Sequence, residues 1–377
     1  MIMDDASHKW HAYLNAADAA GIPPVPNPEI IKSLKQVFAL SEFVAAGCTR
    51  DPAIPVDLID SGDITRQYPK NEYHLKMGPA LSVAADEETL SRLLRRYRRR
   101  EMVRIAWRDL SGWADLSQTV SDLSAFADAC LDHALNMLYQ WQCHLLGTPT
   151  AADGSKQRLV ILGLGKLGAR ELNFSSDVDL IFAYPTAGNT RGAKKSIGNN
   201  EFFSRLCRRL IKVIRQPTAD GFVFRVDPRL RPFGESGPLV MDFETMERYY
   251  QEQGREWERY ALIKARAVAG DKKAGAFLLD RLNPFIYRRY LDYSVFESLR
   301  EMKQMIALEV KRKSMENHIK LGAGGIREIE FFGQIFQLIR GGVNPALQNT
   351  SILAVLTTLA AERHVPQDVC DELTRAY

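Results

Sequence analysis

The sequence lacks the spacings that would tie its cysteines or histidines into a metal or redox site. It has 377 residues but only five cysteines, scattered at positions 48, 130, 143, 207 and 370. No two of them have zinc-ligand or redox-pair spacing, and the seven histidines form no ligand pattern either. A catalytic site in this chain must therefore be built from other side chains.

Long apolar runs and a strong net charge are also missing. No apolar run approaches the length of a membrane span, and the segment Met1-Ile2-Met3-Asp4-Asp5 lacks the basic and apolar regions of a signal peptide. The formal net charge of +4 is too small to indicate nucleic-acid binding. We therefore expect a cytoplasmic protein with neither a membrane nor a nucleic-acid partner.

The chain does contain an ordinary globular composition, arranged in helical and strand-like patterns. With 46% hydrophobic and 25% charged residues, a chain of this length is expected to form two or three domains. Helical apolar spacing covers residues 31–43, 90–107, 121–146 and 201–215, whereas β-propensity favours strands at 158–162, 178–184 and 222–227. Beyond Met241 we expect helix and no strand.

These patterns predict an α+β fold that is predominantly helical, with one small mixed β-sheet unit flanked by helical regions. The expected domains are a helical region at 1–125, an α/β domain at 126–268 and a helical domain at 269–377. The last helical pattern, at 369–377, simply stops, so we expect the final domain to be truncated.

The most informative residues are Asp177 and Asp179, at the start of the apolar strand 178–184. Side chains at i and i+2 of a strand point to the same face, and like charges there repel unless a positive charge lies between them. Carboxylates suit hard cations such as Mg²⁺. The third predicted strand ends at Asp227, and if the two strands are neighbours the three carboxylates converge. We predict that Asp177, Asp179 and Asp227 are catalytic and hold one or two Mg²⁺ ions, which Mn²⁺ can replace.

Simpler explanations exist for each of these carboxylates. Asp177 and Asp179 could form a strand-edge pair exposed to water, although their apolar flanks and the glycines upstream favour a metal site. Asp227 could instead form a salt bridge with Arg225 or Arg229. Spacing alone does not decide between a salt bridge and a metal ligand at this position.

A glycine cluster, Gly163, Gly165 and Gly168, precedes the acidic pair. Glycines let backbone N–H groups approach phosphate closely, and Lys and Arg side chains can meet phosphate directly. The cluster also fits a dinucleotide fingerprint, but only a short segment separates it from the next strand, where that fold needs a full helix. The predicted phosphate- or nucleotide-binding residues are Gly165, Lys166, Ser176, Arg229 and Arg231.

Two further charged segments are expected to have structural roles. Seven arginines crowd positions 92–104, which predicts a solvated or ion-paired helix in preference to a docking surface for an acidic partner. Arg327, Glu328 and Glu330 follow a glycine hinge and are expected to form an ion-pair network that holds two helical blocks.

The glycine cluster and the acidic pair belong to one longer string at 163–182 that closely resembles the bifunctional glutamine synthetase adenylyltransferase/adenylyl-removing enzymes of bacteria. Further matching segments lie at 220–237, 257–266 and 324–330, and two more lie nearer the N-terminus at 39–45 and 98–109. The resemblance implies a nucleotidyltransferase-type sheet unit with Asp177, Asp179 and Asp227 as metal ligands. It also implies that Gly165 and Lys166 lie beside the nucleotide phosphate.

Members of that family carry two nucleotidyltransferase modules. The residues around the acidic pair in this chain resemble those of the N-terminal, adenylyl-removing module. The resemblance implies that inorganic phosphate attacks adenylyl-tyrosine on glutamine synthetase in the bacterial cytoplasm, releasing ADP and free tyrosine. It also implies control by the PII signalling protein, whose uridylylated form favours removal. The alternatives are ATP-dependent adenylylation of glutamine synthetase, or a non-catalytic module that binds PII or glutamine synthetase.

Overall fold

The computed structural model describes residues 2–23, 25, 27–288, 300, 304, 308 and 324–377. The chain divides into two compact units, each assembled from several stretches of sequence. The helical unit contains Met1–Leu138, Arg170–Ser176 and Arg209–Arg225, and the sheet unit contains Tyr139–Ala169, Asp177–Arg208 and Val226–Tyr377. The domain boundaries expected after residues 125 and 268 stay predictions.

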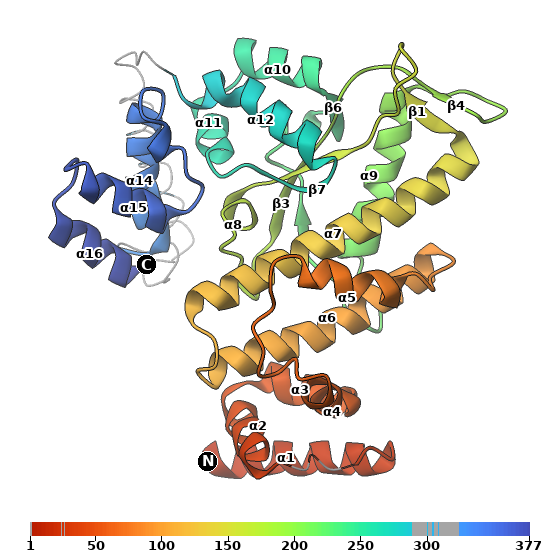
Figure 1. Ribbon diagram of the computed structural model, residues 1–377, viewed down its shortest axis with the longest axis vertical. Coiled ribbons are helices and arrows are strands. Elements are labelled where there is room, and N and C mark those ends of the chain that lie inside the picture. Colours follow the sequence, from red (N-terminus) through yellow and green to blue (C-terminus); the bar gives the residue numbers. More distant parts are fainter. Residues whose placement is uncertain are drawn as a thin grey trace. The chain divides into compact units, whose positions relative to one another are not determined.

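The helical unit begins with a series of helices (Figure 1). They are α1 (Ile2–Ala19), α2 (Pro28–Leu40), α3 (Glu42–Arg50), α4 (Ala53–Asp60), α5 (Glu72–Leu81), α6 (Glu87–Leu110) and α7 (Leu116–Leu146). The last turns of α9 (Asn199–Arg215) also belong to this unit, whereas the end of α7 and the start of α9 belong to the sheet unit.

Side-chain caps determine where the first helices begin. Asn27 accepts a hydrogen bond from the N–H of Glu29 at 2.9 Å, at the start of α2. Ser41 accepts one from the N–H of Val44 at 3.2 Å, at the start of α3. Because Ser41 ends α2 and caps α3, the single helix predicted at 31–43 is wrong, and two helices meet there instead.

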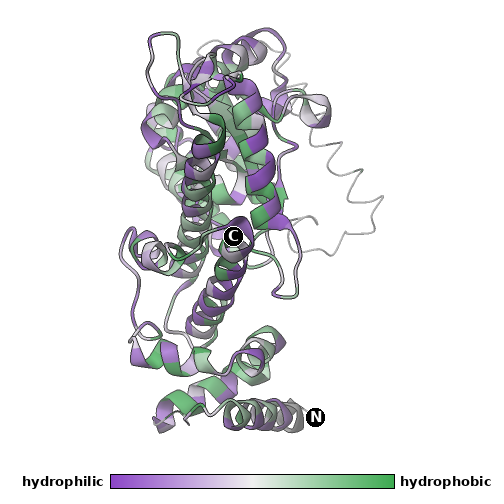
Figure 2. Cartoon of the chain, turned by 90° about the vertical axis from the view of Figure 1, so that its right-hand side faces the viewer, coloured by the Kyte–Doolittle hydropathy of each residue, from purple (hydrophilic) through white to green (hydrophobic). Residues whose placement is uncertain are grey.

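Apolar side chains from α1 to α4 pack on one face of α6. Phe38, Leu58 and Trp107 are fully buried in this cluster. Hydrophobic and hydrophilic residues are interspersed along the helices (Figure 2). Within the residues that the structure describes, no helix combines the length and the apolar character that crossing a membrane requires.

The arginine-rich helix α6 is held by ion pairs. Arg100 donates to Asp63 at 2.8 Å, and the fully buried Arg104 pairs with Asp122 at 3.1 Å. Burial alone would raise the pKa of Asp63, but hydrogen bonds from Lys76 and Arg100 outweigh burial and hold that pKa well below its usual range. The prediction of an ion-paired helix is confirmed for these arginines, and partners of this kind are what buried charges require.

The sheet unit contains a mixed sheet whose strands, in the described residues, are β2 (Val160–Gly163), β3 (Val178–Tyr184), β5 (Val226–Asp227), β6 (Val240–Asp242) and β7 (Arg266–Gly270). The strand order is β5-β3-β2-β7, and β6 pairs with the other end of β3. β2 runs antiparallel to both of its neighbours, while β5 and β6 run parallel to β3. A separate two-stranded sheet joins β1 (Thr148–Thr150) to β4 (Asn189–Arg191).

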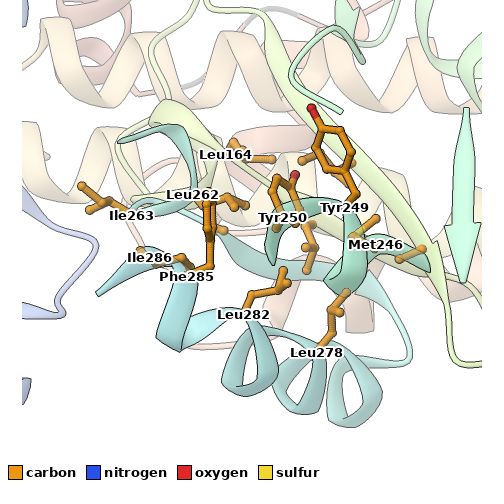
Figure 3. Close-up of a cluster of buried hydrophobic side chains, with 14 of the residues drawn as sticks. Leu164, Met246, Tyr249, Tyr250, Leu262, Ile263, Leu278, Leu282, Phe285 and Ile286 are labelled. Atoms are coloured by element: carbon orange, nitrogen blue, oxygen red, sulfur yellow. The ribbon is translucent and has the colours of Figure 1, made fainter. Parts of the chain in front are cut away.

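Helices cover one face of the mixed sheet and form its main core (Figure 3). Those that contribute are α10 (Phe243–Glu252), α11 (Glu256–Leu262), α12 (Lys272–Ile286) and, through Phe331 and Leu338, α14 (Ile326–Arg340). Ile181 and Ala183 of β3 belong to this core. Asp179 shares their face of the strand because side chains alternate, so it lies at the edge of the core.

The C-terminal part of the sheet unit is helical. It contains α14 (Ile326–Arg340), η2 (Pro345–Leu347), α15 (Ile352–Ala361) and α16 (Gln367–Ala376), which share a small core of their own. Gly325 is the N-cap of α14, and Gly324 before it has a positive φ of 71°. Gly322, the first glycine of the predicted hinge, lies outside the described residues, and the hinge stays a prediction.

The predicted fold class is confirmed, as are the bounds of the strand at 178–184. The expectation of no strand beyond Met241 is wrong, because β7 lies at Arg266–Gly270 and β6 extends to Asp242. The small residues of β7 give little β-propensity, and its pairing with β2 makes it a strand. The third predicted strand is shorter than expected, since Val223 donates instead to Ile214 of α9 at 3.0 Å.

Gly168, in the short helix α8 (Gly165–Gly168), packs against backbone. A Cβ at this position would lie 1.7 Å from the carbonyl oxygen of Lys264, which no side-chain rotation can relieve. We predict that Gly168→Ala lowers the free energy of unfolding by roughly 2 kcal/mol or more, seen as a lower thermal midpoint in differential scanning fluorimetry. Gly198→Ala is the control, because its Cβ would have its nearest neighbour at 3.9 Å. Equal midpoints for the two variants would contradict the packing argument.

Candidate active site

The strands that carry the predicted acidic residues are neighbours. β5 pairs in parallel with the start of β3, with Val178 opposite Val226 and Asp179 opposite Asp227. Both carboxylates are half-buried, whereas Asp177, one residue before the strand, is exposed. The predicted neighbourhood of the second and third strands is therefore confirmed, and Asp179 and Asp227 share one register position of the ladder.

The glycine cluster forms a tight turn against Asp179. Gly165 has a φ of +53°, and a Cβ there would lie 2.9 Å from Oδ2 of Asp179. The N–H of Leu164 donates to the carbonyl oxygen of Asp179 at 2.9 Å. Only glycine tolerates both the left-handed backbone and the close carboxylate. Since α8 has four residues, the full helix that a dinucleotide fold needs after its glycines is not formed here.

Arg229 is bound to Asp227. Its Nε lies 2.9 Å from both carboxylate oxygens, its Nη2 lies 2.5 Å from Oδ2, and its own N–H donates to Oδ1 at 2.9 Å. These hydrogen bonds and the charge of Asp227 raise the pKa of Arg229, with smaller contributions from Glu235 and Asp179. The Asp227–Arg229 salt bridge is therefore formed, and the positive charge of Arg229 interacts with the carboxylates of both Asp227 and Asp179.

Arg231 has a different position from Arg229. Its guanidinium donates to the carbonyl oxygens of Pro228 at 2.8 Å, Glu235 at 3.0 Å and Gly237 at 3.3 Å. It therefore holds together the loop that follows β5, in which Phe233 has a positive φ of 61°. Contact of Arg231 with a phosphate stays a prediction.

The other predicted phosphate-site residues are Lys166 and Ser176. Lys166 lies in α8, next to Gly165 in the glycine turn, and is half-buried. Ser176 belongs to the helical unit, where its N–H donates to the carbonyl oxygen of Asn173 at 3.0 Å. Lys166 is thus in the same unit as the paired carboxylates, and Ser176 is not.

Carboxylate oxygens in register suit a hard cation chemically. In the part of the chain that the structure describes, however, no three histidine, cysteine, aspartate or glutamate side chains are grouped closely enough to hold an ion as they stand. Asp227 is instead neutralised by Arg229. The donor set therefore fits Mg²⁺ by residue type and by strand register, and metal binding by Asp177, Asp179 and Asp227 stays a prediction.

Sequence reasoning missed a group of basic residues that support the site. Arg266 donates to the carbonyl oxygens of Gly168 at 3.1 Å and Leu167 at 2.9 Å, beneath the glycine turn. The buried Lys264 pairs with Glu330 at 2.5 Å. Both cations lie in the segment 257–266. The available signal for their structural role was that several charged residues alternate there with apolar ones.

The same segment ties the later helices together. Arg259 is fully buried and donates to the last carbonyls of α12 and α14, at Ile286 with 2.8 Å and at Leu338 with 3.0 Å. Glu330 pairs with Lys264, which was not among the predicted network residues, and a network of Arg327 with Glu328 and Glu330 stays a prediction.

Two family profiles match the chain. The family described as glutamate-ammonia ligase adenylyltransferase matches residues 31–280, which include the glycine turn and all three predicted carboxylates. The family described as GlnD PII-uridylyltransferase matches residues 300–377.

Curated relatives are similar over nearly the whole chain. A bifunctional glutamine synthetase adenylyltransferase/adenylyl-removing enzyme from Nitrosococcus oceani is 53% identical over 366 residues, which are 97% of this chain and 38% of the relative. An enzyme with the same description from Pseudomonas aeruginosa is 51% identical over 367 residues, 97% of this chain and 37% of the relative. The chain thus spans somewhat more than a third of these relatives' length. The fold, the glycine turn with its paired carboxylates and the profile match together show that the chain belongs to the glutamate-ammonia ligase adenylyltransferase family of nucleotidyltransferases.

Proposed function

We propose that the chain is the adenylyl-removing module of a longer bifunctional enzyme. It removes AMP from adenylyl-tyrosine of glutamine synthetase by metal-dependent phosphorolysis, giving ADP and unmodified glutamine synthetase. The register of Asp179 opposite Asp227, beside the glycine turn, is the observation that carries the proposal. The descriptions of the relatives, which include adenylyl removal and glutamine synthetase, support the choice of substrate.

The bonds exchanged in this reaction need little proton transfer from the protein. An oxygen of inorganic phosphate forms a bond to the adenylyl phosphorus, while the bond from that phosphorus to the tyrosine oxygen breaks. The phosphate is already anionic at neutral pH, so no strong general base is required. The departing tyrosine oxygen has an unperturbed pKa of about 10, so its negative charge needs stabilising by a cation.

The residues of the site supply charge and position for this exchange. Asp177, Asp179 and Asp227 would hold Mg²⁺ or Mn²⁺, and the bound ion supplies positive charge to the transferring phosphoryl group. Gly165 brings backbone close to the nucleotide phosphate and Lys166 adds a point charge there. The site works mainly by holding the reacting groups in line.

Arg229 binds the incoming phosphate in this proposal. It is exposed, its guanidinium is already bound to the carboxylate of Asp227, and its forked donors match phosphate oxygens. When the Arg229 side chain moves from Asp227 to a dianionic phosphate, it exchanges one charge-assisted hydrogen bond for another. Arg231 is less available, because its donors hold loop carbonyls.

The module acts in the bacterial cytoplasm under control of the PII signalling protein, whose uridylylated form favours removal. Incubation with adenylylated glutamine synthetase, Mg²⁺ and phosphate, with and without uridylylated PII, should release ADP fastest when all are present. Transfer of labelled AMP from ATP onto glutamine synthetase would favour the forward reaction instead. Binding without any Mg²⁺-dependent turnover would indicate a non-catalytic module.

We predict that Asp179→Asn and Asp227→Asn each lower the rate of ADP release at least about 100-fold, because each removes a charge that the phosphoryl-transfer site needs. The thermal midpoint should stay within a few degrees of the parent value. Asp280→Asn, an exposed position on α12, is the matched control and should keep full activity. Full activity in both site variants would remove the carboxylates from the mechanism.

We predict that Arg229→Lys raises the KM for inorganic phosphate roughly tenfold, because an ammonium cannot make forked contacts with phosphate oxygens. Arg231→Lys should instead lower the thermal midpoint, because three loop carbonyls lose their donor. The measurements are initial rates against phosphate concentration and thermal melts of both variants. A larger rise in KM for Arg231→Lys than for Arg229→Lys would reverse the assignment.

A further inference from the structure

The helical unit contains a cationic groove whose residues have no role in the site assigned above. The groove is formed by the last turn of α9 and by the chain that follows it. Its volume is about 450 Å³, and it is lined by Ile211, Lys212, Arg215, Gln216, Pro217, Phe222 and Arg225. Three of these residues are cations, three are apolar and none is acidic.

The walls of the groove are fixed by hydrogen bonds. After α9 the chain turns back, with N–H to O=C bonds of 2.9 Å in both directions between Thr218 and Gly221. Arg95 is almost fully buried and donates to the carbonyl oxygen of Gly221 at 2.7 Å and to that of Gln216. Because one buried guanidinium holds both sides of the turn, the groove keeps its shape without a ligand.

None of the residues that line the groove is acidic. Lys212 and Arg215 are exposed, and neither forms an ion pair or side-chain hydrogen bond with any residue that the structure describes. The acid closest in sequence to the turn, Asp220, is already paired with Arg99 at 3.1 Å and Arg50 at 3.4 Å. Arg225, the third cation of the groove, donates to the carbonyl oxygen of Ser175. An acidic ligand would therefore meet Lys212 and Arg215 without competition from an ion pair among the described residues.

A further cation lies against the floor of the groove. The guanidinium of Arg98 lies 4.9 Å from the ring centroid of Phe222, and its Nε is buried without a hydrogen-bond partner among the described residues. Burial lowers the pKa of Arg98; Cys130 opposes this shift and the positive charge of Arg225 adds to it. Positive charge thus accumulates on both sides of the aromatic floor.

Helix-dipole stabilisation explains only part of this arrangement. Cations are favourable in the last turn of a helix, which accounts for Lys212 and Arg215. It does not account for Arg225, which lies outside the helix, for Arg98 behind Phe222, or for the lack of any acid in the lining.

The shape of the groove favours a protein segment over a small molecule. Small-molecule sites bury most of their ligand, whereas this groove is open to solvent. An extended segment can instead lay an apolar side chain on Pro217 and Phe222 while its carboxylates meet the cations.

We propose that this groove docks an acidic segment of the protein substrate. The proposal rests on the proposed function, in which that substrate is adenylylated glutamine synthetase. Docking by Lys212, Arg215 and Arg225 strengthens substrate binding without contributing to the chemical step. Electrostatic docking of this kind weakens as salt rises.

The test compares two charge reversals in the full chain. Lys212→Glu/Arg215→Glu should raise the KM for adenylylated glutamine synthetase roughly tenfold or more while kcat stays within about twofold. Lys272→Glu/Lys273→Glu makes the same change in net charge on exposed residues of α12 and should leave both constants unchanged. Lys212→Arg/Arg215→Lys should keep the parent KM. Thermal melts of each variant check that the fold is retained.

Binding measured without turnover separates this proposal from the proposed function. The dissociation constant for adenylylated glutamine synthetase, from biolayer interferometry at several salt concentrations, should rise in the groove variant and show a weaker salt dependence. If the dissociation constant rises in this way but the parent chain releases no ADP, the docking proposal stands and the proposed function is contradicted. The docking proposal is overturned if Lys212→Glu/Arg215→Glu leaves both the dissociation constant and the KM unchanged, or if the α12 control variant has an equal effect. It is also overturned if Lys212→Glu/Arg215→Glu loses the binding of free ADP or free phosphate.

Discussion

The parallel pairing of β5 with the start of β3 is the constraint on which the candidate site depends. It contains only two residues of β5, Val226 and Asp227, and sets Asp227 opposite Asp179. A shift of one residue would turn Asp227 to the other face of the sheet, because side chains alternate along a strand. Because the ladder is so short, it contributes few hydrogen bonds of its own. Packing and hydrogen bonds of the neighbouring residues must therefore fix its register. Val226 is buried, and Arg231 braces the loop that begins at Pro228.

The glycine turn depends on a second set of supports, contributed by a segment about a hundred residues later in the chain. The carbonyls of Leu167 and Gly168 accept from Arg266, and the backbone of Gly168 packs against that of Lys264. Lys264 also pairs with Glu330, so this segment connects the glycine turn to α14. Groups held by packed and hydrogen-bonded neighbours are the ones that keep a catalytic geometry.

Much of the site could be predicted from the sequence because its signals are local. The strand at 178–184, the glycine turn before it and the place of Asp227 at the end of a strand all follow from spacing and residue type. The strand β7 could not be predicted in this way, because its residues become a strand only through pairing with β2. The sequence also could not show that Arg229 binds the Asp227 carboxylate while Arg231 binds loop carbonyls. Both residues belong to one Arg-Leu-Arg motif, and their contacts differ only because of where the loop turns.

Sequence reasoning also treated the basic run of α6 as one feature, and the structure divides it by partner. Arg100 and Arg104 are paired inside the helical unit, Arg95 holds the turn after α9, and Arg98 lies on Phe222. The roles of Arg95 and Arg98 depend on the return of residues 209–225 to the helical unit, a tertiary event that periodicity along α6 does not encode.

The central claim is that the paired carboxylates bind a divalent cation. Titration of the parent chain, Asp179→Asn and Asp227→Asn with Mn²⁺, followed by electron paramagnetic resonance of the free ion, tests it without any need for turnover. The account predicts that the parent chain binds Mn²⁺ at one or two sites and that either substitution weakens binding at least about tenfold, since each removes an anionic ligand. Identical Mn²⁺ binding by the parent chain and both variants would contradict the account.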